Sequence, residues 1–149
     1  MNAGDLFHVG IVTDDLNGTL DELTTSLGYE WCAQTRVSVP VTLPDGDTVV
    51  DLRFTYSRTT PRLEIVQSIP GTVWTPAKDA AVHHLGYWSD DVEADAADLE
   101  RRGYRAEAVG RDGDGTARWT YHRRADGPRI ELVSRAIQAG LEHYWSPTG

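Results

Sequence analysis

One strand-like phrase occurs twice in the sequence. Residues 61–66 read Pro-Arg-Leu-Glu-Ile-Val, and residues 128–133 read Pro-Arg-Ile-Glu-Leu-Val. Successive side chains of a β-strand point to opposite faces, so each phrase separates its aliphatic side chains from one glutamate, Glu64 or Glu131. An unpaired carboxylate inside a core is strongly destabilising, and it needs a cation, hydrogen-bond donors or a metal ion. Two copies of this arrangement indicate a shared purpose.

Further similarities recur in the same order and extend the repeat to nearly the whole chain. Residues 7–16 resemble residues 83–92, and residues 54–58 resemble residues 119–123. In each half, a Thr or Ser and an Asp pair supply N-cap chemistry for a helix, and a Gly-Tyr pair marks the end of that helix. The repeat predicts an α+β fold made of two β-α-β-β-β modules.

The predicted boundaries place both modules in one domain, residues 1–149. Module 1 is expected at about 5–68, a linker at about 69–80, module 2 at about 81–134 and a C-terminal helix at about 135–145. The expected strands are 5–13, 30–38, 48–57, 61–68, 81–89, 104–110, 116–123 and 128–134, the helices 15–27 and 91–102, with extra turn residues at 40–47. Leu16, Leu20, Leu23 and Leu27 recur at helical spacing and predict an apolar stripe that faces the core.

Composition excludes several classes of protein. The 149 residues, 40% hydrophobic and 25% charged, are typical of a soluble globular domain. A net charge of −9 without a basic stripe disfavours nucleic-acid binding. No apolar run approaches the roughly 18 residues of a membrane helix, and the N-terminus lacks the pattern of a secretory signal. The single cysteine, Cys32, excludes an intrachain disulfide and favours a cytoplasmic location.

Strand parity gathers four polar side chains on one concave face. His8 and His84 lie opposite the aliphatic side chains of their strands, as do Glu64 and Glu131. Two imidazoles and two carboxylates suit a divalent ion such as zinc, nickel, cobalt, iron(II) or manganese. His83 adjoins His84, but parity and the register with His8 favour His84 as the ligand and leave His83 packed or in a polar contact.

Two alternatives concern residues near this set. Arg62 and Arg129 each lie two positions from a glutamate on the same strand face, so a buried salt bridge is an alternative partner for each carboxylate. The second concerns aromatic residues that either line a substrate pocket or belong to ordinary core: Tyr56, Trp74, Trp88, Trp119 and Tyr121. An aromatic-lined pocket suits a partly apolar or ring-containing substrate.

This set of motifs resembles the vicinal oxygen chelate superfamily, which includes glyoxalase I, methylmalonyl-CoA epimerase, extradiol dioxygenases and bleomycin-resistance proteins. The resemblance covers essentially the whole chain, with His-x-Gly on the first strand and Glu on the last strand of each module. It implies a cupped, incompletely closed mixed β-barrel, flanked by helices, in which His8, Glu64, His84 and Glu131 converge on one divalent metal ion. It also implies a homodimer, with the modules paired within one chain or exchanged between two.

The resemblance favours a metal-dependent isomerase, epimerase or lyase. The ion polarises a carbonyl or two neighbouring oxygens of a small-molecule substrate, and Glu64 or Glu131 moves a proton. The halves are too alike for the sequence to choose between these glutamates. One alternative is an iron(II) ring-cleaving dioxygenase, although its usual ligand set needs a single carboxylate. The other is a metal-free drug-binding protein of the bleomycin-resistance kind, and such relatives generally lack the ligand set.

Overall fold

The order of the elements displays the repeat. The computed structural model describes residues 1–78 and 81–148. The strands are β1 (Leu6–Thr13), β2 (Thr35–Leu43), β3 (Gly46–Tyr56), β4 (Leu63–Gln67), β5 (His84–Ser89), β6 (Arg105–Arg111), β7 (Ala117–Arg123) and β8 (Ile130–Ser134). The helices are α1 (Leu16–Leu27), α2 (Val92–Arg101) and α3 (Gln138–Trp145), with short 3-10 helices at Ala3–Asp5 and Arg135–Ile137. In the described parts of the chain, no helix is long and apolar enough to cross a membrane.

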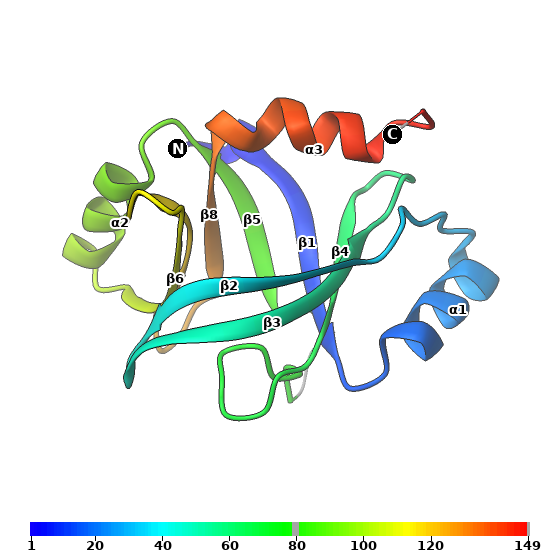
Figure 1. Ribbon diagram of the computed structural model, residues 1–149, viewed down its shortest axis with the longest axis horizontal. Helices are drawn as coiled ribbons and strands as arrows, with labels where there is room; N and C mark the ends of the chain where they lie inside the picture. The colour runs from blue at the N-terminus through cyan, green and yellow to red at the C-terminus, as the bar shows by residue number, and fades with distance from the viewer. Residues whose placement is uncertain (79–80, 149) are drawn as a thin grey trace.

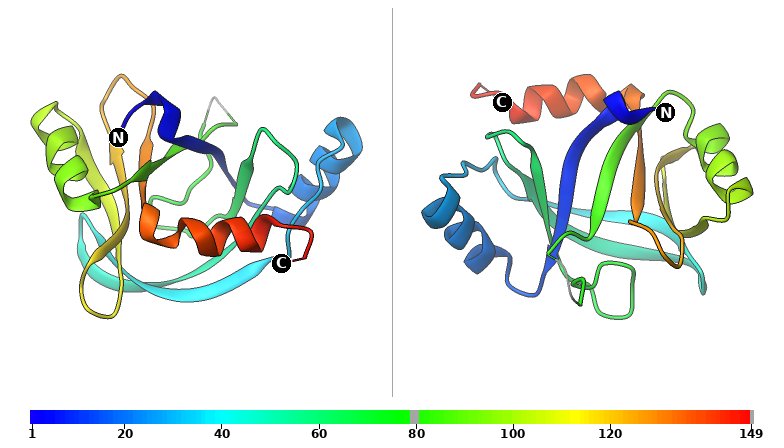
Figure 2. Two further views of the ribbon diagram at one scale, coloured as in Figure 1. Left: turned by 90° about the horizontal axis from the view of Figure 1, so that it is seen from above. Right: turned by 180° about the vertical axis from the view of Figure 1, so that it is seen from behind.

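The strands pair in a ring with the order β1-β4-β3-β2-β6-β7-β8-β5, and β5 pairs back onto β1. The β1–β4 and β5–β8 pairs are parallel and the others antiparallel, which confirms the predicted α+β class and mixed barrel. The ring is closed, whereas an incompletely closed barrel was predicted. The shortest strand pairing in the ring is that between β2 and β6, where Val41 pairs with Gly110 and Thr42 with Val109. Helices α1 and α2 lie on opposite sides of the barrel, and α3 runs across one end (Figures 1 and 2).

Local chemistry fixes the ends of the two module helices. The Asp15 side chain accepts a hydrogen bond from the Gly18 N–H at 3.0 Å, and the Asp91 side chain accepts one from the Ala94 N–H at 3.0 Å. Both N-caps predicted from the Asp pairs are therefore present. Helix α1 ends at Gly28, whose φ of 74° is the left-handed conformation expected of a terminating glycine.

The aliphatic strand faces pack beneath these helices. Leu16 and Leu20 of α1 form one core cluster with Ile65 of β4, and Leu132 of β8 forms another beneath α2. The predicted apolar stripe of α1 does not extend to Leu27, whose exposed fraction is 65%. Leu27 is the last residue of the helix, next to the C-cap glycine, Gly28.

The turn predicted at residues 40–47 is wrong, because most of these residues belong to strands. Strand β2 continues to Leu43, and a turn at residues 44–45 leads directly into β3. Pro40 lies within β2, opposite Val49, although a proline usually interrupts pairing. Its missing N–H is tolerated because the second neighbour, β6, pairs with β2 from Val41 onward.

The two His-x-Gly motifs interlock where β1 meets β5. His8 lies opposite Gly86, and Gly10 lies opposite His84. A Cβ atom on Gly10 would overlap the His84 ring, and a Cβ atom on Gly86 would overlap the His8 ring. Each glycine therefore makes room for the histidine of the other module.

We expect Gly10→Ala to lower the free energy of unfolding by about 1–3 kcal/mol, because the new methyl group displaces a fully buried ring. Urea denaturation measures this loss. Gly140→Ala in α3 is the matched control, since its Cβ meets open space and alanine favours a helix. If Gly10→Ala unfolds at the wild-type urea concentration, the interlocking of the two motifs does not constrain the barrel.

Candidate metal centre

The four side chains predicted as ligands meet inside the barrel. The Nε2 atoms of His8 and His84 are 3.0 Å apart. Glu64 Oε2 lies 3.1 Å from His84 Nε2, and Glu131 Oε2 lies 3.0 Å from His8 Nε2. One ligand atom from each residue falls within 4.8 Å of the others, and all four residues are buried.

Strand pairing explains why each glutamate meets the histidine of the other module. Gly10 of β1 pairs with Glu64 on β4 and with His84 on β5. Gly86 of β5 likewise pairs with Glu131 on β8 and with His8 on β1. Across the sheet, Gly10 therefore lies between Glu64 and His84, and Gly86 lies between Glu131 and His8. Because glycine has no side chain, the glutamate and the histidine on either side of it can meet.

This arrangement fits a divalent ion better than it fits a set of hydrogen bonds. Two ring nitrogens 3.0 Å apart share at most one proton between them. Within the described residues, Glu131 Oε2 makes no well-aligned hydrogen bond although it is buried. Two imidazole nitrogens and two carboxylate oxygens crowded around one point are the donor set of zinc, nickel, cobalt, iron(II) or manganese. His8, Glu64, His84 and Glu131 are therefore the residues that can hold such an ion.

Ionisation within the cluster is strongly perturbed. Burial by itself lowers the pKa of His8, but hydrogen bonds and charge from Glu131 and Glu64 outweigh it and raise this pKa from 6.5 to about 9. Burial by itself raises the pKa of Glu64, but His8 and His84 outweigh it and hold this pKa well below its usual range. In the metal-free protein, a proton held by the histidine pair therefore offsets carboxylate charge, and an ion must displace that proton.

The alternative of buried arginine salt bridges is wrong, because both arginines have other partners. The Arg62 guanidinium donates to the Ser57 carbonyl and lies 4.0 Å from the centre of the Trp145 ring. Arg129 Nε donates to Glu107 at 2.5 Å. The charged groups that face the two glutamates are thus the histidines, His8 and His84.

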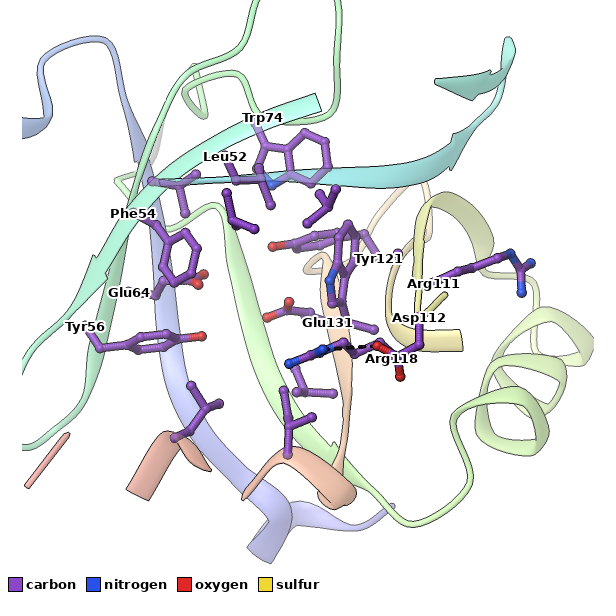
Figure 3. A pocket seen from close by; sticks show the side chains of 18 residues that line it. Leu52, Phe54, Tyr56, Glu64, Trp74, Arg111, Asp112, Arg118, Tyr121 and Glu131 are labelled. Atoms are coloured by element: carbon purple, nitrogen blue, oxygen red, sulfur yellow. Dashed lines mark hydrogen bonds and ion pairs between the residues drawn. The ribbon is translucent and has the colours of Figure 1, made fainter. Parts of the chain in front are cut away.

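A cavity of about 240 Å³ opens above the carboxyl groups, which point into it (Figure 3). Four of the aromatic residues predicted as pocket walls line it: Tyr56, Trp74, Trp119 and Tyr121. Trp88 does not line this cavity and instead belongs to the buried core, the other alternative given for it. The β1–β5 pairing shifts register between Leu6 and His8, and Phe7 stacks on Trp88 with ring centres 3.8 Å apart.

Sequence reasoning missed much of the remaining wall. It is mainly aliphatic, with one polar edge, and includes Val39, Leu52, Phe54, Ile137, Leu141, Arg111, Asp112 and Arg118. At that edge, Arg118 Nη1 donates to Asp112 Oδ1 at 3.0 Å (Figure 3). The alternation of residues along the strand predicted at 48–57 carries a signal for part of this wall, because Leu52 and Phe54 share a strand face with Tyr56.

Fold and site together define a duplicated β-α-β-β-β barrel with a central cluster of two histidines and two glutamates. Residues 7–122 match the family model described as the glyoxalase/bleomycin resistance protein/dioxygenase superfamily. The chain belongs to this superfamily, as its motifs predicted. No curated protein matches the chain in sequence.

Solved structures with the same fold include several methylmalonyl-CoA epimerases. A variant of the Streptomyces coelicolor enzyme in complex with 2-nitronate-propionyl-CoA is 23% identical, with a TM-score of 0.61 over 89% of this chain and 97% of that chain. The Mycobacterium tuberculosis epimerase is 16% identical, with a TM-score of 0.55 over 92% and 91%. A hypothetical protein of Bacillus halodurans C-125 is 14% identical, with a TM-score of 0.56 over 87% and 93%. At these identities the likeness establishes the fold.

We expect the metal-free protein to lose stability as the pH rises from 6.5 to about 9. Below pH 6.5 His8 is protonated in the native and unfolded states, and its pairing with the carboxylates contributes in full. As the pH passes the native pKa of about 9, His8 loses its proton and this contribution disappears. Thermal unfolding after chelation measures the effect. His8→Asn should flatten the decline, and a wild-type midpoint that rises over this window would contradict the assignment.

Proposed function

We propose that the chain is a divalent-metal-dependent enzyme that moves a proton next to a carbonyl group, in isomerase, epimerase or lyase chemistry. The observation that carries the proposal is the cluster of four ligand atoms within 4.8 Å of one another, whose two glutamates line a largely apolar cavity. When bound, the ion supplies Lewis acidity toward a carbonyl or a pair of neighbouring substrate oxygens. The superfamily and the epimerase fold of its structural neighbours are consistent with this chemistry.

The glutamates are the candidate general bases. Glu64 and Glu131 are 7% and 6% exposed, and their carboxyl groups border the cavity, so a substrate carbon can approach either one. One of them takes the proton from the carbon beside the carbonyl and returns it, while the other remains with the histidines. Such general-base action contributes about 10²- to 10⁴-fold in rate.

Two tyrosines complete the polar part of the cavity. The Tyr56 ring packs edge-on against His8, and the Tyr121 ring packs edge-on against His84, with ring centres 5.4 and 5.0 Å apart. Burial, followed by the charges of the two glutamates, raises the pKa of each phenol well above its usual value. Both hydroxyl groups therefore stay protonated, and they point into the cavity as hydrogen-bond donors for a substrate oxygen (Figure 3).

The cavity favours a small, partly apolar substrate or the acyl end of a larger one. Its volume of about 240 Å³ accommodates a short carbon skeleton, and aromatic and aliphatic side chains form most of its wall. Structural neighbours were solved with methylmalonyl-CoA and with 2-nitronate-propionyl-CoA, so a CoA thioester is one candidate and a free carbonyl compound is the other. The homodimer and the cytoplasmic location stay predictions, which sedimentation and cell fractionation test.

We expect Glu64→Gln and Glu131→Gln each to reduce metal content, and at least one of them to reduce turnover by about 10²- to 10⁴-fold. The assay follows solvent deuterium incorporation into a panel of carbonyl substrates, with elemental analysis of each variant. Glu30→Gln is the matched control, because Glu30 is exposed and outside the cavity. If both glutamine variants retained full metal content and turnover, the glutamates would have neither role.

The two alternative functions have their own readouts. Oxygen uptake with iron(II) and a catechol would identify a ring-cleaving dioxygenase. Tight drug binding by a protein that takes up no divalent ion would identify a sequestering protein.

A further inference from the structure

His83 is a buried histidine outside the ligand set, and it makes two polar contacts. Its exposed fraction is 4%. His83 Nε2 lies 2.8 Å from the Val73 carbonyl oxygen, and His83 Nδ1 lies 2.9 Å from His84 Nδ1. The imidazole thus bridges the intermodule linker and a candidate metal ligand.

The chemistry of these contacts determines where the protons are. A carbonyl oxygen only accepts, so His83 Nε2 carries a proton and donates it to Val73. In a neutral imidazole the other nitrogen is then an acceptor, so the proton between His83 and His84 resides on His84 Nδ1. With Nδ1 as its donor, His84 can give up the proton on Nε2 and present that nitrogen to an ion while Nδ1 keeps its hydrogen bond to His83. The opposite arrangement would place a proton on Nε2 of neutral His84 and block it as a ligand.

The neutral state of His83 has a structural cause. The ring is buried, and the Arg129 guanidinium donates to the His83 carbonyl at 3.2 Å, which places a fixed positive charge beside it.

The linker holds the Val73 carbonyl in place. Its turn is closed by a hydrogen bond from the Ile69 N–H to the Trp74 carbonyl at 2.8 Å and by one from Thr72 Oγ1 to the Ile69 carbonyl at 2.7 Å. Trp74, 1% exposed, anchors this turn in the cavity wall. The segment that joins the modules therefore also orients His83.

The equivalent histidine of module 1 lacks such support. Phe7 occupies the position before His8, and it stacks on Trp88 instead of offering an acceptor. Within the described residues, His8 Nδ1 is buried without a hydrogen-bond partner. The two histidine ligands are thus related by the repeat but differ in what stands behind them.

We propose that His83 is a positioning residue: supported by Val73 of the linker, it selects the His84 tautomer whose Nε2 faces the metal centre. This inference rests on the proposed metal-dependent function. It makes His84 the pre-organised ligand and leaves His8 to adopt its binding form when the ion arrives. Outer hydrogen-bond partners of metal-bound histidines fix the tautomer in this way, and their loss typically weakens metal binding by about 10- to 100-fold.

The first test needs no metal. In the chelated wild-type protein, nitrogen-15 NMR of its five histidines should show His83 as the neutral form protonated at Nε2. A His83 protonated at Nδ1, or doubly protonated near pH 7, would overturn the proposal. This test decides the tautomer even if the protein binds no ion, an outcome that would instead refute the proposed function.

The second test compares two substitutions by zinc titration against a competing chelator. His83→Phe reproduces the module 1 residue and removes both polar atoms, so its zinc dissociation constant should rise by about 10- to 100-fold. His83→Asn keeps an acceptor near the position of Nδ1 and should retain most of the affinity. Unchanged affinity in His83→Phe, or equal losses in both variants, would overturn the proposal. Should His83→Phe fail to fold, the NMR test of the His83 tautomer still decides the proposal.

Discussion

The structure depends on compensation for two carboxylates that are almost entirely removed from water. Glu64 and Glu131 occupy the middle of core strands, where an uncompensated charge is strongly destabilising. The neighbouring arginines bind elsewhere, and the compensation comes from two histidines on adjacent strands. Because an imidazole nitrogen must be unprotonated to bind an ion, the same residues form internal ion pairs without metal and can act as a ligand set with it.

The barrel brings these residues together through backbone pairing. The closed ring sets β1 beside β5, and one glycine on each strand leaves the space in which a histidine and a glutamate meet. The two modules differ at the residue before the histidine ligand, which is Phe7 in module 1 and His83 in module 2. A second difference is the linker, whose Val73 carbonyl accepts a hydrogen bond from His83. Two similar modules have thus produced a centre whose two halves are supported differently.

The features that occur in both modules could be predicted from the sequence. Strand parity and residue spacing are local properties of the chain. They predict the order of strands and helices, the Asp15 and Asp91 caps, and the shared face of the histidines and the glutamates. Three features were beyond it because they depend on tertiary context: the tolerance of Pro40 in β2, the stacking of Trp88 on Phe7, and the contribution of α3 to the cavity. The closure of the barrel could not be predicted either, because it depends on the pairing of β2 with β6, which are distant in the sequence.

The most direct test of the central claim is anomalous diffraction from crystals grown with nickel or zinc. We expect a single strong peak beside β1 and β5, with Nε2 of both histidines and one oxygen of each glutamate around it. Crystals with no peak there, in which the carboxyl groups turn apart and the imidazoles no longer face one another, would contradict it. The chain would then be a duplicated barrel whose buried charges serve stability alone.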